Sequence, residues 1–408
     1  MKYFIPSYII KTSNNDNIIL ENTLNQSIVE LSIEFSRNFD ILLKNGCNYL
    51  KTKLEKLLYQ QGFLIKRNIN RKNSILINKV MDKTLFLTIM PTEACNFRCI
   101  YCYEKKTSSK MTDEIICGIE RFILELTKRN SFEIIQVSWF GGEPLLALEI
   151  IMRINSFIFE LAKENNLRFL STITTNGYLL NFTNFSSLIN SGIKNFQITL
   201  DGSKHDQTRP LVNGKPTLRK ILDNLLEISR KSINRDFIIL LRNNILAGER
   251  DFSWYDQLKK LFGNDSRFEY SVIPVGKLGG ENDDKFDIVE SNDNLIKEHN
   301  EYINEINLRS DFYQHGLVFS SICYASYKHG FVIREDGKIA KCTIALYDEL
   351  NEVGFLKGDH FYIDDKKNKL WYRETLDNKC YSCTKCLACM NKYCPLRKIK
   401  YNEDRWCL

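Results

Sequence analysis

The sequence lacks the features that mark membrane, exported and repetitive proteins. It contains no run of about eighteen uncharged apolar residues, which excludes a membrane-spanning helix. Its N-terminal segment has a short apolar run but no small-residue cleavage site, so it does not predict an export signal. No internal repeat of fixed period and no low-complexity tract is present. We therefore expect a cytoplasmic protein with no membrane partner.

A strong charge of either sign is also absent. The 408 residues include 57 Lys and Arg against 50 Asp and Glu, which gives a net charge of +7. The basic residues are scattered or lie in short runs, which favours a solvated surface over a nucleic-acid partner. Apolar residues make up 43% of the chain and charged residues 26%, as in ordinary globular proteins, and the length predicts two or three domains.

The chain is instead rich in cysteine, with 13 residues. Short spacings in a chain without an export signal predict metal binding rather than disulfides. Cys47 and Cys117 stand apart, and we expect them to be small buried apolar residues. The remaining cysteines form a group of three and a group of eight: Cys95, Cys99 and Cys102; then Cys323, Cys342, Cys380, Cys383, Cys386, Cys389, Cys394 and Cys407.

Residues 1–70 have the pattern of a small α+β domain. We expect strands at 8–11 and 17–21, a returning strand at 27–31, two short helices, and a final strand at 63–65. A hairpin, helices and a last strand in so short a segment predict a winged-helix-like layout.

The central part of the chain alternates β-branched or aromatic runs with helical patterns. Six strands with helical connections predict parallel βαβ units and an α/β fold. Reactive groups in such a sheet collect on the loops after the carboxyl ends of the strands. The predicted strands are 85–90, 134–139, 169–174, 195–200, 237–243 and 267–273.

The last third of the chain is less regular. A helix is expected near 294–306, and Asp336-Gly337 predicts the turn of a hairpin within the cysteine-rich end.

The loop after the first predicted strand carries Cys95, Cys99 and Cys102. Four-iron clusters take four ligands, so three thiolates on one loop leave one iron open to a substrate. The alternative is a structural zinc site, but zinc takes a closed set of four ligands, and no fourth Cys or His lies near in the sequence.

This spacing, with Tyr101 beside the last cysteine, resembles the signature of radical S-adenosylmethionine (SAM) enzymes. The resemblance implies a partial (β/α)6 TIM-like barrel over residues 80–275, one [4Fe-4S] cluster that binds SAM, and an electron donor such as flavodoxin or ferredoxin. It also implies that SAM is cleaved to a 5′-deoxyadenosyl radical, which takes a hydrogen atom from the substrate.

The same resemblance implies several residues near SAM, including Tyr101. Arg209 would help to hold the SAM carboxylate, and a structural salt bridge is the alternative role for it. The remaining positions match the loop at the methionyl amino group and the segment near the ribose: Gly141, Gly142, Glu143 and Pro144; then Thr175 and Asn176.

The C-terminal cysteines resemble the SPASM extension, which implies a domain over residues 310–408 with two auxiliary four-iron clusters. The outer cluster would take Cys380, Cys383, Cys389 and Cys407, and the inner one Cys323, Cys342 and Cys394. The inner set has three cysteines, one fewer than a four-iron cluster takes. Cys386 is not assigned by the resemblance, and it is either the fourth ligand of the inner cluster or part of a different arrangement. Zinc knuckles are the alternative, because the two-residue spacings suit zinc too.

The N-terminal segment resembles a precursor-peptide recognition element, whose ligand adds as a strand to an exposed sheet edge. The sequence therefore predicts a maturase that installs a thioether or carbon–carbon crosslink in a ribosomally made precursor peptide. One alternative is an anaerobic sulfatase-maturating enzyme. In those enzymes an Asp follows the cysteine that matches Cys342, whereas this chain has Thr343.

Another alternative is a non-catalytic iron–sulfur electron-transfer protein or a zinc-binding nucleic-acid module, which would leave the glycine-rich loop unexplained. No catalytic base can be named from the sequence. Tyr178, Asn244 and Thr343 are candidates for shaping the substrate site, because they lie near predicted strand ends.

Overall fold

The computed structural model describes residues 3–5, 9–13, 17–22, 28–60, 63–64, 82–232, 236–290, 292–308, 323–372 and 394–401. The chain divides into two compact units, one formed by Lys83–Phe312 with His329–Asn368 and the other by the remaining segments. No helix in the described ranges is long and apolar enough to cross a membrane.

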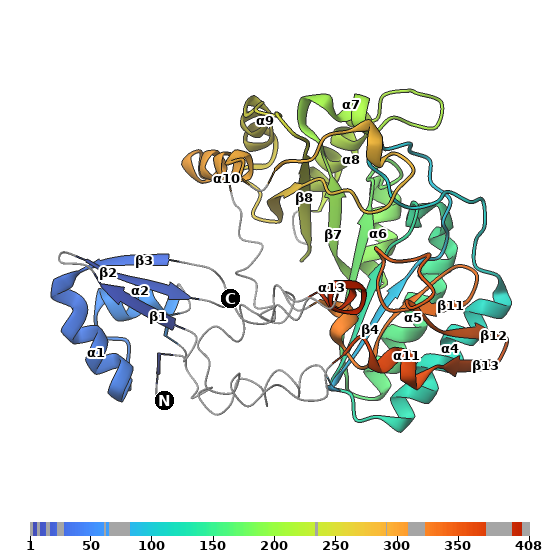
Figure 1. Ribbon diagram of the computed structural model, residues 1–408, viewed down its shortest axis with the longest axis horizontal. Helices are drawn as coiled ribbons and strands as arrows, with labels where there is room; N and C mark the ends of the chain where they lie inside the picture. The colour runs from blue at the N-terminus through green and yellow to red at the C-terminus, as the bar shows by residue number, and fades with distance from the viewer. Residues whose placement is uncertain are drawn as a thin grey trace. The chain divides into compact units, whose positions relative to one another are not determined.

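Six parallel strands form the centre of the larger unit (Figure 1). All six predicted strands are confirmed, each within two residues at either end. Their β-branched and aromatic residues fit a pleated, half-buried surface; in the second strand Ile135, Val137 and Trp139 are fully buried. In spatial order the strands are β4 (Thr84–Ile89), β5 (Ile134–Trp139), β6 (Arg168–Thr175), β7 (Ile193–Thr199), β8 (Ile238–Ile245) and β9 (Phe268–Pro274).

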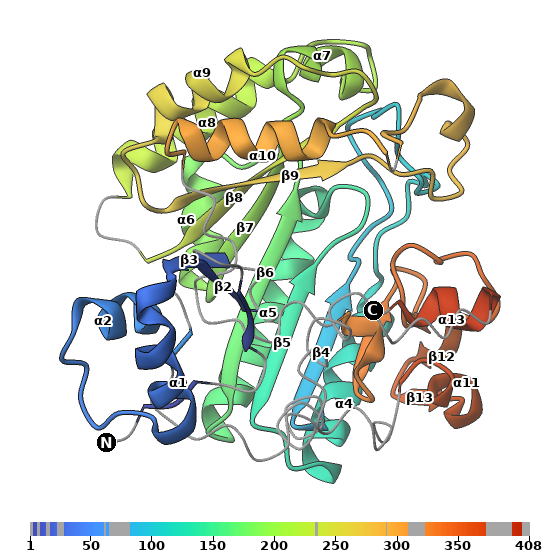
Figure 2. The ribbon, with the colours of Figure 1, turned by 60° about the vertical axis from the view of Figure 1, so that its left-hand side comes forward.

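Helices connect these strands and pack along the sheet (Figures 1 and 2). The first begins at Thr112, whose hydroxyl accepts a hydrogen bond from the Ile115 N–H, and it buries Ile119, Phe122 and Ile123. The helix predicted near 294–306 is confirmed. The helices are α4 (Asp113–Arg129), α5 (Leu148–Glu164), α6 (Phe182–Asn190), α7 (His205–Thr208), α8 (Leu218–Lys231), α9 (Ser253–Phe262) and α10 (Leu295–Glu305), with short 3-10 turns at Pro144–Ala147, Gly202–Lys204 and Asp283–Lys285.

The sheet continues beyond β4 into the Cys342 segment. Strand β10 (Gly330–Ile333) runs parallel to β4, and β11 (Lys338–Ala340), β12 (Glu352–Lys357) and β13 (His360–Ile363) follow as antiparallel neighbours. The predicted hairpin turn is confirmed: Gly337 has φ +84°, a left-handed conformation that glycine adopts without strain. The segment ends in α11 (Asp365–Lys369).

The smaller unit contains an antiparallel sheet of β1 (Ile9–Ser13), β2 (Asn17–Asn22) and β3 (Ile28–Ser32), with β2 in the centre. These strands confirm the predicted N-terminal pattern. The chain then forms a 3-10 turn, Ile33–Phe35, and two helices, α1 (Ser36–Asn45) and α2 (Lys53–Gln60). A 3-10 turn, Tyr324–Ser326, and helix α13 (Pro395–Tyr401) also belong to this unit.

The strand predicted at 63–65 is wrong for the two residues that the structure describes. Phe63 and Leu64 form a bend, and their N–H groups donate to the Leu58 carbonyl at 2.7 and 3.0 Å. These bonds satisfy a carbonyl at the end of α2, and both side chains are buried, which accounts for their apolar character without a strand.

Candidate functional site

The three-cysteine loop follows the carboxyl end of β4, as predicted. Backbone hydrogen bonds hold it to the end of α7 and to the residues just beyond: Arg98 N–H donates to the Pro210 carbonyl at 2.8 Å, and Ile100 N–H to the Thr208 carbonyl at 2.9 Å. Phe97, which directly precedes Arg98, is buried. The loop therefore has a defined backbone despite having no helix or strand of its own.

The thiols of Cys95, Cys99 and Cys102 border one cavity of about 350 Å³, a size at the lower end of small-molecule sites. Burial raises the pKa of Cys95 to about 12, against the lowering effect of the Lys106 ammonium. Burial also raises the pKa of Cys99, which the Arg209 guanidinium opposes. In the described part of the chain, no three His, Cys, Asp or Glu side chains converge so as to hold a single metal ion.

The glycine-rich loop after β5 lies directly against the start of the cysteine loop. A Cβ atom on Gly141, where φ is +114°, would lie 2.6 Å from the Thr92 carbonyl oxygen, and one on Gly142 would lie 2.2 Å from that of Ala94. The Glu143 N–H donates to the Ala94 carbonyl at 2.8 Å. Glycine is required at both positions because the two backbones approach too closely for any side chain.

Glu143 is fully buried and ties this loop to the one after β6. One carboxylate oxygen accepts from the Thr175 hydroxyl at 2.6 Å and from the Leu145 N–H at 3.0 Å, and the other accepts from the Asn176 N–H at 2.7 Å. Burial raises the pKa of Glu143, and these donors oppose the rise. The carboxylate thus positions two walls of the cavity.

Tyr101 joins three strand ends through its hydroxyl. The hydroxyl donates to the Asp201 carboxylate and accepts from Arg209 Nη1 and Asn244 Nδ2, each at 3.0 Å. The Thr208 hydroxyl donates to the same Asp201 oxygen at 2.8 Å. Burial raises the pKa of Tyr101, so the phenol stays neutral and keeps its proton for Asp201.

Arg209 lies over the Phe97 ring, 5.8 Å from its centroid. Among the described residues it forms no ion pair within 4.0 Å, although its charge interacts with the buried Asp201 carboxylate. Its Nε is buried and has no hydrogen-bond partner in the described ranges, so this donor is available to a ligand in the cavity.

The structure brings together nearly all the residues expected near SAM. Pro144 differs: it begins the 3-10 turn after the glycine-rich loop and is not part of the cavity wall. Those that border the cavity are Tyr101, Gly141, Gly142, Glu143, Thr175, Asn176 and Arg209.

Of the three candidates for shaping the substrate site, Asn244, Tyr178 and Thr343, only the first lines the cavity. Asn244 borders the cavity, whereas the Tyr178 ring packs edge-on against Phe97 with centroids 5.9 Å apart. Thr343 hydrogen-bonds the phenol of Tyr103, which borders the cavity beside Cys102.

Sequence reasoning missed several cavity residues, among them Gln197, Thr199 and Arg242. Alternation along the strands would have placed Gln197 and Thr199 on one face of β7, but alternation does not say which face meets the cavity. Lys106 was missed as well; it hydrogen-bonds Cys102 and interacts with the Glu104 carboxylate.

Cys342 is buried immediately after β11, and Asn351 fixes its backbone. The Asn351 side chain accepts from the Cys342 N–H and donates to the Cys342 carbonyl, both at 2.8 Å. Asn351 is itself fully buried. A buried amide with these bonds holds the cysteine in one place.

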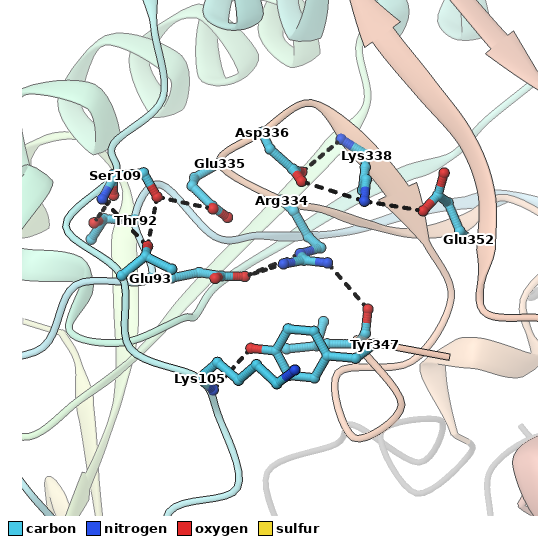
Figure 3. Close-up of polar contacts among 12 residues, drawn as sticks. Thr92, Glu93, Lys105, Ser109, Arg334, Glu335, Asp336, Lys338, Tyr347 and Glu352 are labelled. Atoms are coloured by element: carbon cyan, nitrogen blue, oxygen red, sulfur yellow. Dashed lines mark hydrogen bonds and ion pairs between the residues drawn. The ribbon is translucent and has the colours of Figure 1, made fainter. Parts of the chain in front are cut away.

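A buried ion pair links the β10–β11 hairpin to the cysteine loop (Figure 3). Arg334 Nε donates to Glu93 Oε1 at 3.1 Å, and Arg334 lies over the Tyr347 ring, 5.1 Å from its centroid. The Tyr347 hydroxyl accepts from the Lys105 N–H at 2.9 Å. The Ser109 hydroxyl donates to Glu335 at 3.1 Å. Both ends of the cysteine loop are therefore tied to the segment that carries Cys342.

The other cysteines are less informative. Cys323 and Cys394 are half-buried in the smaller unit, and Cys380, Cys383, Cys386, Cys389 and Cys407 lie outside the described residues. The expectation that Cys47 and Cys117 are buried is wrong. Cys47 is half-buried after α1, and Cys117 is exposed on α4, where its sulfur accepts from Arg153 at 3.4 Å.

Comparison with known proteins agrees with this geometry. Residues 89–247 match the model of the Radical SAM superfamily. The GTP 3′,8-cyclase of Campylobacter jejuni (strain RM1221) is 28% identical over 178 residues, which is 43% of this chain and 52% of that protein. The chain thus spans about half the length of the curated relatives it matches.

Solved structures share the fold. Native anSMEcpe with bound AdoMet aligns with TM-score 0.51 and 17% identity over 74% of this chain and 88% of that one. Native anSMEcpe with bound AdoMet and Kp18Cys peptide aligns with TM-score 0.50 and 18% identity over 75% of this chain and 88% of that one. The mixed α/β architecture with a partial parallel barrel is therefore confirmed.

The radical SAM family uses a four-iron cluster and SAM, and the residues present fit both. Three thiols line the cavity, together with the backbone of Gly141 and Gly142 and the buried Arg209, whose Nε has no hydrogen-bond partner in the described ranges. The motif, the sheet and the family match together place residues 89–247 in the radical SAM superfamily of enzymes.

Proposed function

We propose that this protein is a radical SAM peptide maturase that installs a thioether or carbon–carbon crosslink in a ribosomally made precursor peptide. The observation that carries the proposal is the single cavity that unites the three cysteine thiols with the loops after β5, β6 and β7. When bound, the cluster and SAM supply a 5′-deoxyadenosyl radical that removes a hydrogen atom from the substrate.

The chain's own residues prepare this site. Cys95, Cys99 and Cys102 would hold the four-iron cluster that supplies the electron for cleaving SAM. Arg209 and the Gly141–Gly142 backbone orient the methionyl end of SAM, and Glu143 fixes the loop that meets the ribose.

A groove in the N-terminal segment supports a peptide substrate. Apolar side chains from the end of β3 and from α1 and α2 border an open groove, and several of them are exposed, including Ile41 and Leu57. Strand β3 has a neighbour on one side only within the described residues. An extended peptide can pair with such an edge while its apolar side chains enter the groove. The related fold in anSMEcpe binds Kp18Cys peptide.

The remaining cysteines are assigned to two auxiliary four-iron clusters, with Cys323, Cys342 and Cys394 in the inner one. The outer cluster takes Cys380, Cys383, Cys389 and Cys407. Held by these cysteines, the clusters would supply an acceptor for the electron that crosslinking releases, and a flavodoxin or ferredoxin would be the reductant for the SAM-binding cluster. Support comes from the Tyr103–Thr343 hydrogen bond, which joins the neighbours of Cys102 and Cys342.

Crosslinking is favoured over sulfatase maturation at position 343. The Thr343 hydroxyl is hydrogen-bonded to Tyr103. Sulfatase-maturating enzymes have a carboxylate at the matching position, and a neutral hydroxyl is a much poorer proton acceptor than a carboxylate. The crosslinking proposal requires no base at this position.

The test is anaerobic reconstitution of the full chain with iron, sulfide, SAM and a reductant, followed by assay for 5′-deoxyadenosine. Co-expression with the short open reading frame beside the gene should yield a peptide that has lost two hydrogen atoms, about 2 Da. A thioether blocks alkylation of the modified cysteine, whereas a carbon–carbon bond leaves cysteines free. The Cys95→Ala, Cys99→Ala, Cys102→Ala triple variant is the control, and 5′-deoxyadenosine from that variant would overturn the proposal.

A further inference from the structure

The segment after β9 runs over the cysteine loop. It leaves the sheet at Val275, whose N–H donates to the Ile245 carbonyl at 2.9 Å. Further along, the buried Phe286 ring packs edge-on against the ring of Tyr101, with centroids 6.5 Å apart. Both ends of the segment are therefore fixed to the barrel. We call the residues between these two points, 276–282, the strap.

At Gly280 the strap touches the backbone of the cysteine loop. A Cβ atom on Gly280 would lie 2.7 Å from Tyr103 Cα and 2.8 Å from the Cys102 carbonyl oxygen. Both neighbours are backbone atoms, so no side-chain rotation can make room for a Cβ atom. Elsewhere the strap is less crowded: a Cβ atom on Gly276 would meet the Leu278 side chain at 3.7 Å, an ordinary contact distance.

The strap lies between two cavities. The first is the cavity of the three thiols, and the second has a volume of about 630 Å³. Cys99 and Cys102 border both of them. The strap residues at the first cavity are Gly276 and Leu278, and those at the second are Gly279, Glu281 and Asn282.

The second cavity opens to solvent. Its border includes the exposed residues Arg98 and Lys105. Of the two cavities, Cys95 borders the first alone, whereas Cys102 borders both. Because Gly280 packs on the Cys102 backbone, the strap covers the cysteine loop at the thiol that lies between the two cavities.

We propose that Gly280 is a positioning residue for Cys102, and that the strap it seats separates the cavity of the three thiols from the solvent-facing second cavity. Direct contact between two backbones leaves the cysteine loop little freedom to shift. The inference rests on the proposed function, in which Cys102 is a cluster ligand. It adds the segment after β9 to the parts that hold this ligand in place.

The test compares Gly280→Ala with Gly276→Ala, the matched control on the same strap. Neither glycine has a positive φ, so the two variants differ in what the new methyl group meets. The full chain is prepared reduced and free of metal, and its reaction with N-ethylmaleimide is followed thiol by thiol with mass spectrometry. Gly280→Ala should raise the rate at Cys102 about fivefold or more, because the overpacked strap opens. The rate at Cys95 should change less than about twofold, as should both rates in Gly276→Ala.

A second variant loosens the strap without adding atoms. The Asp283 carboxylate accepts from the Gly279 N–H at 2.7 Å, and Asp283→Ala removes this acceptor. The rate at Cys102 should rise in this variant too. In the reconstituted chain, the change in the electron paramagnetic resonance signal on adding SAM should differ between Gly280→Ala and wild type, because the ligand has moved.

Two results would overturn the inference. One is an unchanged rate at Cys102 in both Gly280→Ala and Asp283→Ala. The other is an equal rise at the buried Cys342, which would mean that Gly280 supports the whole fold and not the cysteine loop. The alkylation rates are measured without iron or SAM, so they decide the role of Gly280 even if the reconstituted wild type fails to cleave SAM, a result that would overturn the proposed function instead.

Discussion

At the scale of single residues, buried carboxylates do most of the positioning. Glu143, Asp201 and Glu93 each hold donors from a different segment, and none of them faces bulk water. Such groups are difficult to replace, because removing one partner leaves the other buried and unsatisfied.

Replacing Glu143 by Gln tests this at the centre of the site. The amide NH2 would face a backbone donor, either the Asn176 N–H or the Leu145 N–H, so at least one hydrogen bond is lost. We expect the free energy of unfolding to fall by about 1–3 kcal/mol. Urea denaturation of the variant measures this loss.

Glu149→Gln is the control for that measurement, because the Glu149 side chain is 69% exposed and its ion pair with Lys110 is on the surface. The control should be within about 0.5 kcal/mol of wild type. Equal stabilities for the two variants would contradict the role assigned to Glu143.

A second carboxylate gives a dependence on pH. Burial raises the pKa of Glu335 to about 7, helped by the negative charges of Glu93 and Asp336. The folded pKa lies above the ordinary value of about 4.5, so folding favours the protonated form. The contribution of Glu335 to the free energy of unfolding is therefore fully present below about pH 4.5, and it is lost as the pH rises through about 7.

Unfolding at pH 5 and pH 8 checks this sign. Relative to Glu335→Gln, the wild-type chain should lose about 1–2 kcal/mol of stability between the two values, because solvent screens part of the interaction. Parallel stability curves for both proteins would show that Glu335 titrates normally.

At the scale of elements, the β10–β11 hairpin and the cysteine loop behave as one assembly. Arg334→Met leaves Glu93 as a buried charge without its partner and should cost about 3–5 kcal/mol. The double variant Glu93→Leu, Arg334→Met should recover most of that loss, because both charges are removed. Thermal or urea unfolding of the three proteins measures the cycle.

The surface pair Lys338–Glu352, at 3.4 Å, is the matched control on the same hairpin. Lys338→Met should cost about 1 kcal/mol or less. A loss as large as that of Arg334→Met would mean that the hairpin itself, and not the buried pair, is sensitive to substitution.

Elements also show what the sequence could predict. The six central strands were found within two residues because each is a compact β-branched run bounded by turn residues. Strands β10 to β13 were missed apart from one turn, since they are short and β10 pairs with β4 across a large sequence separation. Likewise, the motifs predicted the cysteine loop and the glycine-rich loop of the cavity wall, whereas the places of Arg242 and Asn351 depend on packing between distant segments.

At the scale of the whole molecule, the proposed function assigns binding of the precursor peptide to the smaller unit and cleavage of SAM to the larger one. If the N-terminal groove holds the peptide, Ile41→Asp with Leu57→Asp should weaken binding of the co-expressed precursor at least tenfold, because a charge enters an apolar contact. SAM cleavage should be unaffected. Fluorescence anisotropy with labelled precursor measures the binding.

Leu43→Asp is the control, since Leu43 is 52% exposed on the same helix but does not border the groove. Equal weakening by both substitutions would place the peptide elsewhere.

The pairing of β10 with β4 has a consequence for dissecting the protein. Because β10 covers the outer edge of β4, the barrel does not end where its family match ends. A fragment cut before residue 330 would present the backbone N–H and C=O groups of β4 to other chains. Unpaired strand edges form hydrogen bonds with strands of other molecules. Such a fragment should therefore aggregate and should not be a soluble, active barrel domain.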